Sequence, residues 1–230
     1  MPYFHTENHR SQHASWLRAT VLGANDGIIS LACLIIGMAS GGAATHNIGL
    51  AAIAGLLAGA LSMAAGEYVS VRSQADTEAA DIAKETQELL EEPERELLEL
   101  KGIYKARGLS SELALEVATA LTAHNALEAH LRDELGIVEA QMANPLQAAL
   151  ASAASFTLGA SVPGLCILLA PPHLLVTITP LASLLCLYAL GAGAAKIGGA
   201  PWFVAANRVL IWGAGAMAIT AGAGYLFGAA

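Results

Sequence analysis

The sequence predicts an all-α membrane protein with five transmembrane helices and a cytosolic three-helix domain inserted between the second and third. Five stretches are apolar and long enough to cross a hydrocarbon core of about 30 Å, which takes roughly 20 helical residues. Charged residues make up only 13% of the chain, and from Ala140 to Ala230 the only charged side chains are Lys196 and Arg208. A soluble domain could not cover its surface with so few charges. The stretches are approximately 21–41, 48–69, 146–170, 174–195 and 204–228.

The connections between these stretches give the order of the chain. Residues 1–20 form a polar tail, 21–69 hold the first two spans, 70–142 form the insert, and 146–230 hold the last three spans. The insert is rich in Glu, Ala, Leu, Lys and Arg, which favour helices.

Breakers and caps divide this insert into three predicted helices. The first continues from the second span to about Glu92, and the second begins at Pro93 and ends at Gly108. The third is capped by Ser110 or Ser111 and runs to about residue 142.

The formal net charge of −8 is concentrated in the insert. Residues 76–139 hold sixteen of the nineteen acidic side chains and six of the eleven basic ones. This balance disfavours nucleic acid as a partner, because its phosphates would be repelled, and favours cations such as metal ions.

The Lys and Arg residues predict the orientation. With five crossings, all eleven fall on one side of the bilayer. The positive-inside rule then places the N-terminus and the insert in the cytosol and the C-terminus outside.

Three side chains in the first two spans are candidates for chemistry. Asp26 lies in or at the edge of the first span, where burying a carboxylate costs about 2.5–3.5 kcal/mol and a carboxylate is a functional candidate. Met63 and Glu67 are four residues apart on one helix face, and together offer a thioether and a carboxylate to a late first-row metal. The structural alternatives are an N-cap role for Asp26, packing for Met63, and a boundary position for Glu67.

The insert carries a second set of candidate ligands. Carboxylates recur at helical spacing on its first two helices, and an imidazole and a carboxylate are four residues apart on its third. Carboxylates with an imidazole in a helical bundle are typical ligands of Fe²⁺, Mn²⁺ or Zn²⁺. The alternative is a solvated acidic surface partly neutralised by nearby Lys and Arg. The candidates are Glu85, Glu88, Glu96, Glu99, His130 and Glu134.

The sequence shows no enzyme signature and no site for a prosthetic group. A phosphate-binding loop, an HExxH motif and a nucleophile elbow are all missing. Cys33, Cys166 and Cys186 lie in apolar stretches without CxxC spacing, so neither a disulfide framework nor a thiolate metal site is expected.

Several strings resemble the vacuolar iron transporter family. They are VLGANDGIIS in the first span, SMAAGEYVSVRSQADTEAA leaving the second, EEPERELLEL in the insert and HLRDELGI closing it. The resemblance covers nearly the whole chain. It implies a homodimer of five-helix protomers that moves ferrous iron, and often manganese, out of the cytosol in exchange for protons.

The resemblance also implies roles for residues. Asp26, Met63 and Glu67 would line the transport path, and the glutamates of the insert with Glu134 would collect metal. Where family members commonly place a Met-Met pair, this chain has His130 and Leu131. This departure puts an imidazole in place of one soft ligand and removes the other.

Two other functions fit the same residues. The chain would be a membrane-anchored metal-binding or sensor protein if the spans only anchor it, or a transporter of another cation if the insert is merely solvated. The family name implies a vacuolar-type membrane, whereas a short chain without targeting extensions suits a bacterial inner membrane.

Overall fold

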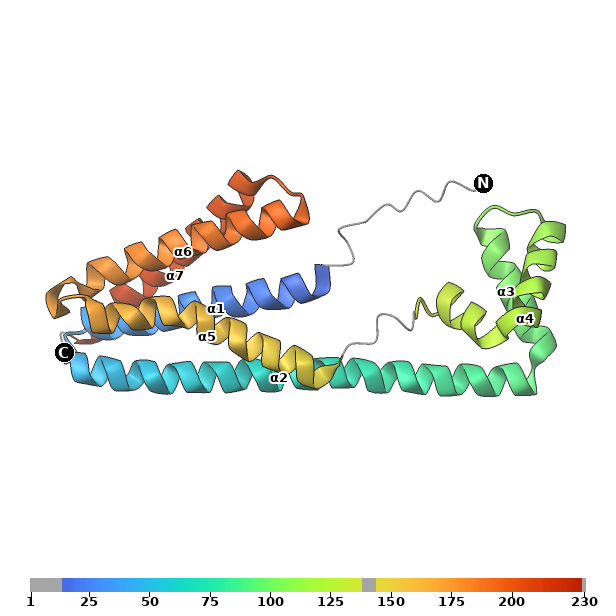
Figure 1. Cartoon of the computed structure of the whole chain (residues 1–230), viewed down its shortest axis with the longest axis horizontal. Helices are drawn as coiled ribbons and strands as arrows, with labels where there is room; N and C mark the ends of the chain where they lie inside the picture. The colour runs from blue at the N-terminus through green and yellow to red at the C-terminus, as the bar shows by residue number, and fades with distance from the viewer. Residues whose placement is uncertain (1–13, 138–143, 229–230) are drawn as a thin grey trace, which may run out of the picture. The chain divides into compact units, whose positions relative to one another are not determined.

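The computed structural model describes residues 14–137 and 144–228, and within these ranges it contains α-helices, one short 3₁₀ turn and no strand. The all-helical prediction is confirmed (Figure 1). Residues 1–13 of the predicted tail, and the predicted end of the third insert helix, lie outside the described residues. The helices are α1 (Ala14–Ser40), α2 (Thr45–Glu91), α3 (Pro93–Ala106), α4 (Ser111–Asp133), α5 (Pro145–Leu169), α6 (Leu175–Gly198) and α7 (Trp202–Gly228), and the 3₁₀ turn η3 is Pro172–Leu174.

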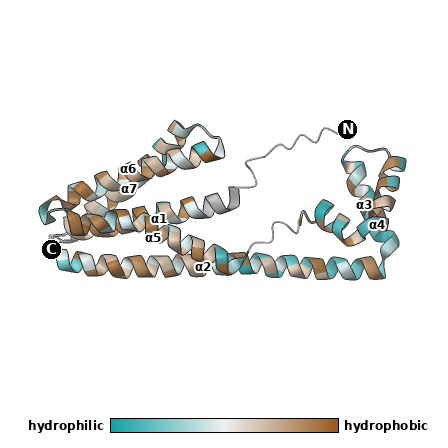
Figure 2. Ribbon diagram, viewed as in Figure 1, coloured by the Kyte–Doolittle hydropathy of each residue, from teal (hydrophilic) through white to brown (hydrophobic). Residues whose placement is uncertain are grey.

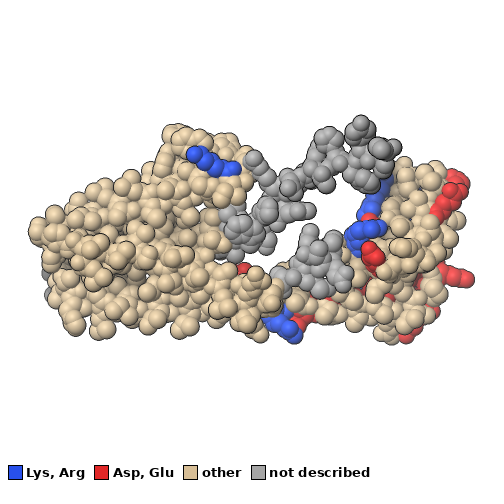
Figure 3. Space-filling model, viewed as in Figure 1, with Lys and Arg blue, Asp and Glu red and all other residues tan. Residues whose placement is uncertain are grey.

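Among the residues that the structure describes, five helices are long and apolar enough to cross a membrane, in agreement with the five predicted stretches. Hydrophobic residues dominate α1, α5, α6, α7 and the first half of α2 (Figure 2). Charged side chains are concentrated in α3, α4 and the second half of α2 (Figure 3). One helix, α2, carries both kinds of sequence, since it runs for 47 residues without interruption.

The chain divides into two compact units, Met1–Tyr68 with Leu146–Ala230, and Val69–Pro145. The first, which we call the membrane unit, holds the spanning segments. The second, which we call the inserted unit, holds the end of α2 with α3 and α4.

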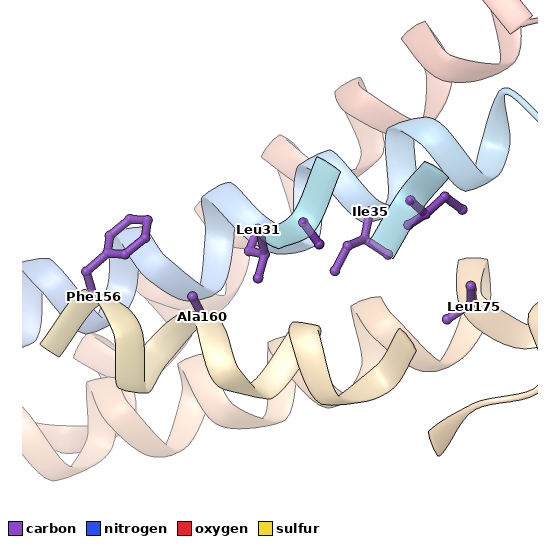
Figure 4. Close-up of a cluster of buried hydrophobic side chains, with 7 residues drawn as sticks. Leu31, Ile35, Phe156, Ala160 and Leu175 are labelled. Atoms are coloured by element: carbon purple, nitrogen blue, oxygen red, sulfur yellow. The ribbon is translucent and has the colours of Figure 1, made fainter. Parts of the chain in front are cut away.

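The core of the membrane unit is built around α1. Leu31 and Ile35 of α1 pack with Phe156 and Ala160 of α5 and with Leu175 of α6 (Figure 4). A second buried cluster joins α1 to α6 and α7. Thus α1 is the central helix of this unit.

Glycines let the backbones of α1 and α5 touch. A Cβ atom added at Gly27 would collide with the carbonyl oxygen of Phe156, and one added at Gly159 would collide with that of Ala24. In a membrane, where lipid is as apolar as leucine, such close backbone packing is a main source of helix association.

The inserted unit is held together by a small apolar core. Leu100 of α3 and Ala118 and Ala129 of α4 are buried, with Leu97 and Leu121 packed beside them. Pro93 begins α3 in its first turn, and the Ser110 hydroxyl accepts a hydrogen bond from Leu113 N at the start of α4. These starts agree with the caps predicted from sequence.

The third insert helix differs from the prediction at two points. Asn125 has non-helical angles (φ −161°, ψ 94°), and its side chain accepts a hydrogen bond from Glu128 N, so α4 contains a kink. The helix ends at Asp133 rather than near residue 142. The cause is Gly136, whose φ of 68° is left-handed and stops the helix.

Candidate metal sites

Four of the six ligands predicted in the insert come together in the inserted unit. Glu85 comes from α2, Glu96 from α3, and His130 and Glu134 from the end of α4. One ligand atom from each lies within 4.8 Å of all the others. Three helices therefore direct three carboxylates and one imidazole to a single point, and we call this group the carboxylate–imidazole cluster.

His130 lies at the centre of the cluster. Its Nδ1 atom is 2.9 Å from Glu85 Oε1, 3.0 Å from Glu134 Oε2 and 3.9 Å from Glu96 Oε2. When Nδ1 carries a proton, it donates a hydrogen bond to Glu134. One N–H cannot serve three carboxylates, so the charge of the cluster is not balanced by the imidazole alone.

Burial makes this imbalance costly. His130, Glu85 and Glu96 are buried, whereas Glu134 is about one-quarter exposed. Among the described residues, His130 Nε2 is buried without a hydrogen-bond partner. Glu85 Oε1 has only its 2.9 Å contact with His130 Nδ1, the nitrogen that is hydrogen-bonded to Glu134. Buried carboxylates are normally paired or bound to a metal, so this donor set fits a divalent cation.

Burial and neighbouring charges raise the pKa values of two carboxyl groups in the cluster. Burial, reinforced by the charge of Glu134, raises the pKa of Glu85. Burial and then the neighbouring charge of Glu99 raise the pKa of Glu96. Both groups therefore hold their protons to a higher pH than exposed glutamates do, and a metal ion must compete with those protons.

The other two predicted ligands in the insert lie outside the cluster. The Glu88 carboxylate is 3.3 Å from Lys84 Nζ, one turn away on α2. Glu99 is exposed and acts on Glu96 only through its charge. Both lie near the cluster in sequence without contributing an atom to it.

A polar network next to the cluster was not predicted. The Tyr104 hydroxyl donates to Asp133 Oδ2 (2.6 Å), and Arg107 Nη1 donates to Asp133 Oδ1 (2.7 Å). Burial opposes ionisation of Asp133, but the hydrogen bonds from Tyr104, Arg107 and Arg132 outweigh it and lower its pKa to about 2. This network joins α3 to the turn of α4 that carries His130 and Glu134.

A pocket of about 240 Å³ in the membrane unit brings together two of the three predicted intramembrane residues. Asp26 of α1 and Met63 of α2 both line it. Asp26 lies in the interior of α1, so the alternative prediction that it caps a helix is wrong. The other lining residues are Ser30, Leu31, Leu34, Gly55, Gly59, Ser62 and Phe156.

The polar lining differs in detail from the prediction. Ser30 Oγ donates a 2.7 Å hydrogen bond to Asp26 Oδ1. Ser30 and Ser62 were missed, although Ser30 is four residues from Asp26 and so on the same helix face. Glu67, one turn beyond Met63 on α2, does not line this pocket.

Five potential spans, a pocket with a carboxylate and a thioether, and a buried carboxylate–imidazole cluster define a polytopic membrane protein with candidate metal sites. A model of the VIT family matches residues 17–225, and the chain belongs to this family. Its members are transporters rather than enzymes, which makes this chain an integral membrane protein of metal-ion transport.

Several named proteins are similar in sequence to this chain along most of their length. A vacuolar iron transporter of Acanthamoeba castellanii is 45% identical, with 98% of this chain and 84% of that protein covered. Vacuolar iron transporter homolog 1 of Oryza sativa subsp. japonica is 34% identical over 94% of this chain and 75% of its own. Vacuolar iron transporter homolog 3 of Arabidopsis thaliana is 35% identical, with 95% of this chain and 86% of that protein covered.

Proposed function

We propose that the protein exports Fe²⁺, and with it Mn²⁺, from the cytosol in exchange for protons, and that the inserted unit collects the metal first. The observation that carries this proposal is the carboxylate–imidazole cluster, in which the buried Glu85 carboxylate shares a single imidazole nitrogen with Glu134. The name of the amoebal relative supports iron as a cargo.

The ligand set of the cluster supports this choice of metals. Three carboxylates and an imidazole, with no sulfur, suit Fe²⁺, Mn²⁺ and Zn²⁺ better than a soft ion such as Cu⁺. His130 takes the place of a methionine in the family pattern described above. The cluster is therefore expected to discriminate less against Mn²⁺ than a thioether site would.

The intramembrane pocket supplies the proposed transport site. Asp26 offers a carboxylate, Met63 a thioether, and Ser30 and Ser62 offer hydroxyl oxygens. A carboxylate in an apolar span is costly unless it is neutralised by a proton or a cation. Alternation of Asp26 between these two states would couple export of the metal to import of protons. We assign Glu67 to the path outside this pocket.

Three further features complete the proposal. The N-terminus and inserted unit face the cytosol, and the C-terminus faces the opposite side, because every Lys and Arg then falls on the cytosolic side. The protein acts as a homodimer in a vacuolar-type or bacterial inner membrane. Ser30 and Ser62 are exposed in the single protomer, which is compatible with a second copy covering the pocket.

Transport by the purified chain in proteoliposomes tests the function. Wild-type protein should accumulate Fe²⁺ and Mn²⁺ inside vesicles that contain a metal-sensitive dye. Asp26→Asn should reduce the rate at least roughly tenfold, because a neutral amide cannot exchange a proton for a cation. Asp76→Asn, an exposed control on α2, should transport at the wild-type rate.

The same assay separates transport from the alternatives. A membrane-anchored sensor would bind metal without moving it into the vesicle. An Asp26→Asn variant that transports as fast as wild type would remove the proposed role of the pocket.

A further inference from the structure

The last three spans hold two basic side chains, and neither has an acidic partner within the described part of the chain. Lys196 lies in the last turn of α6, and Arg208 lies in the second turn of α7. No Asp or Glu occurs between Ala140 and Ala230. Among the described residues, no carboxylate lies within ion-pair distance of either side chain. Since only a short turn separates α6 from α7, both charges belong to the same end of the spans.

Arg208 lines a groove of about 430 Å³ on one face of α7. The surrounding surface is apolar and exposed: Trp212 is 76% exposed and Ile211 is 67% exposed. In Figure 3, blue atoms stand out beside the α6–α7 turn, where the surface around them is tan. The lining residues are Phe203, Val204, Asn207, Arg208, Ile211 and Trp212.

The depth of Arg208 indicates what it meets. It lies six residues from the start of α7, or about 9 Å along a helix with a rise of 1.5 Å per residue. α7 has 27 residues and is about 40 Å long, so when it is centred on a hydrocarbon core about 30 Å thick the Arg208 backbone lies about 4 Å inside the core. From there the long arginine side chain can reach the lipid headgroups. Lys196 lies nearer the start of α7, since its Nζ is 5.8 Å from the centroid of the Trp202 ring.

We propose that this groove binds one anionic glycerophospholipid. The lipid phosphate would pair with the Arg208 guanidinium, whose planar donors match phosphate oxygens, and Lys196 would add positive charge nearby. The acyl chains would run along Ile211 and Trp212. The reason is charge complementarity: an arginine in an apolar surface needs an anion, and the last three spans provide none. This site is separate from the proposed metal path.

Quenching of tryptophan fluorescence by brominated lipids tests the proposal on the full chain. The Trp16→Phe background leaves Trp202 and Trp212 as the only tryptophans. Two sets of vesicles share one ratio of phosphatidylglycerol to phosphatidylcholine and differ only in which lipid carries bromine, at equal mole fraction. Brominated phosphatidylglycerol should be enriched at the groove by roughly fivefold, the preference expected for one basic residue near anionic lipid.

Substitutions assign this preference to Arg208. Arg208→Gln should remove most of it, leaving only the weaker contribution of Lys196, and Arg208→Lys should retain most of it. Arg72→Gln removes the same charge from an exposed arginine that pairs with Asp76 at 2.9 Å, so this control should keep the preference.

Three results would overturn the proposal. Equal quenching by both lipids in the wild-type background would show that the groove does not select an anion, whatever the variants do. A preference that Arg208→Gln leaves undiminished would place the selection elsewhere. Quenching by neither lipid would show that another protein surface, such as a second copy of the chain, covers the groove.

Discussion

Glu85 illustrates how a single residue sets the chemistry of the inserted unit. Its carboxylate is buried, and the oxygen that lies 2.9 Å from His130 Nδ1 shares that nitrogen with Glu134, to which Nδ1 is hydrogen-bonded. A residue in this position destabilises the metal-free fold and stabilises the metal-bound one. We therefore expect Glu85 to contribute to metal binding rather than to the stability of the metal-free fold.

Replacing Glu85 with Gln separates these two effects. The Glu85→Gln variant keeps the side-chain volume and removes a buried charge, so its metal-free form should unfold at the same temperature as wild type or higher. Its affinity for Mn²⁺, followed by electron paramagnetic resonance, should fall at least roughly tenfold. Glu116→Gln, an exposed control on α4, should change neither quantity. Unchanged Mn²⁺ affinity in Glu85→Gln would exclude this carboxylate as a ligand.

The raised pKa values of Glu85 and Glu96 predict how metal binding depends on pH. Both groups hold protons above the ordinary glutamate value of about 4.3, so metal affinity should rise as pH increases through their raised pKa values. The stability of the metal-free fold should respond in the opposite direction. The two protonated carboxyl groups stabilise it fully below a pH of about 4.3, and this stabilisation is lost as pH rises through their raised pKa values. Calorimetric titrations with Mn²⁺ at steps of about half a pH unit between about pH 4.5 and pH 7 measure how the metal affinity changes. A flat affinity over this range would contradict it.

At the scale of helices, the pairing of α1 with α5 depends on direct backbone contact. Gly27 has no room for a side chain, because an added Cβ would strike the backbone of Phe156. Gly66 on α2 has open space at the same position. These two glycines offer a matched pair of substitutions in the membrane unit.

Gly27→Ala should destabilise the membrane unit by about 1–3 kcal/mol, the usual cost of overpacking a well-packed site. Gly66→Ala should be neutral or slightly stabilising, since alanine favours helices. Unfolding of both variants in mixed detergent micelles provides the comparison. Equal stability of the two would show that α1 and α5 pack less closely than described.

The pairing of α3 with α4 depends on a hydrogen-bond network instead. Tyr104→Phe removes the 2.6 Å hydrogen bond to Asp133 and leaves the ring in place. The loss should cost about 1–2 kcal/mol, as for other hydrogen bonds to a charged group. Hydrogen exchange of the α3 and α4 amides should accelerate accordingly, whereas Tyr225→Phe, an exposed control on α7, should leave it unchanged. Unaltered exchange in Tyr104→Phe would mean that the network does not hold the two helices together.

Sequence patterns predicted the helices better than the contacts between them. The five spans follow from apolar stretches of sufficient length, and the starts of α3 and α4 follow from Pro93 and Ser110, which act locally. The Asp133 network was not predictable in this way, because its partners Tyr104 and Arg107 are 29 and 26 residues away. The choice of Glu85 and Glu96 over Glu88 and Glu99 likewise depends on which helix faces meet, and spacing within one helix does not determine this.

At the scale of the whole molecule, two units with different physical properties belong to one chain. The membrane unit is nearly free of charge, whereas the inserted unit carries most of the acidic residues. Each unit contains one carboxylate whose burial costs free energy unless a cation or a proton neutralises it. In the membrane unit it is Asp26, and in the inserted unit it is Glu85. This shared property is the basis for proposing that one metal ion visits both units.

Proton-coupled export requires that a proton gradient drive Fe²⁺ against its own concentration gradient. Proteoliposomes with an acidic interior and equal free Fe²⁺ on both sides isolate this coupling. If export is coupled to protons, Fe²⁺ should accumulate inside beyond its external concentration while the interior becomes less acidic, because each pH unit supplies about 1.4 kcal/mol per proton. Dissipating the gradient with an ionophore should return Fe²⁺ to equilibrium. Fe²⁺ that only equilibrates across the membrane, with or without the gradient, would contradict proton-coupled export.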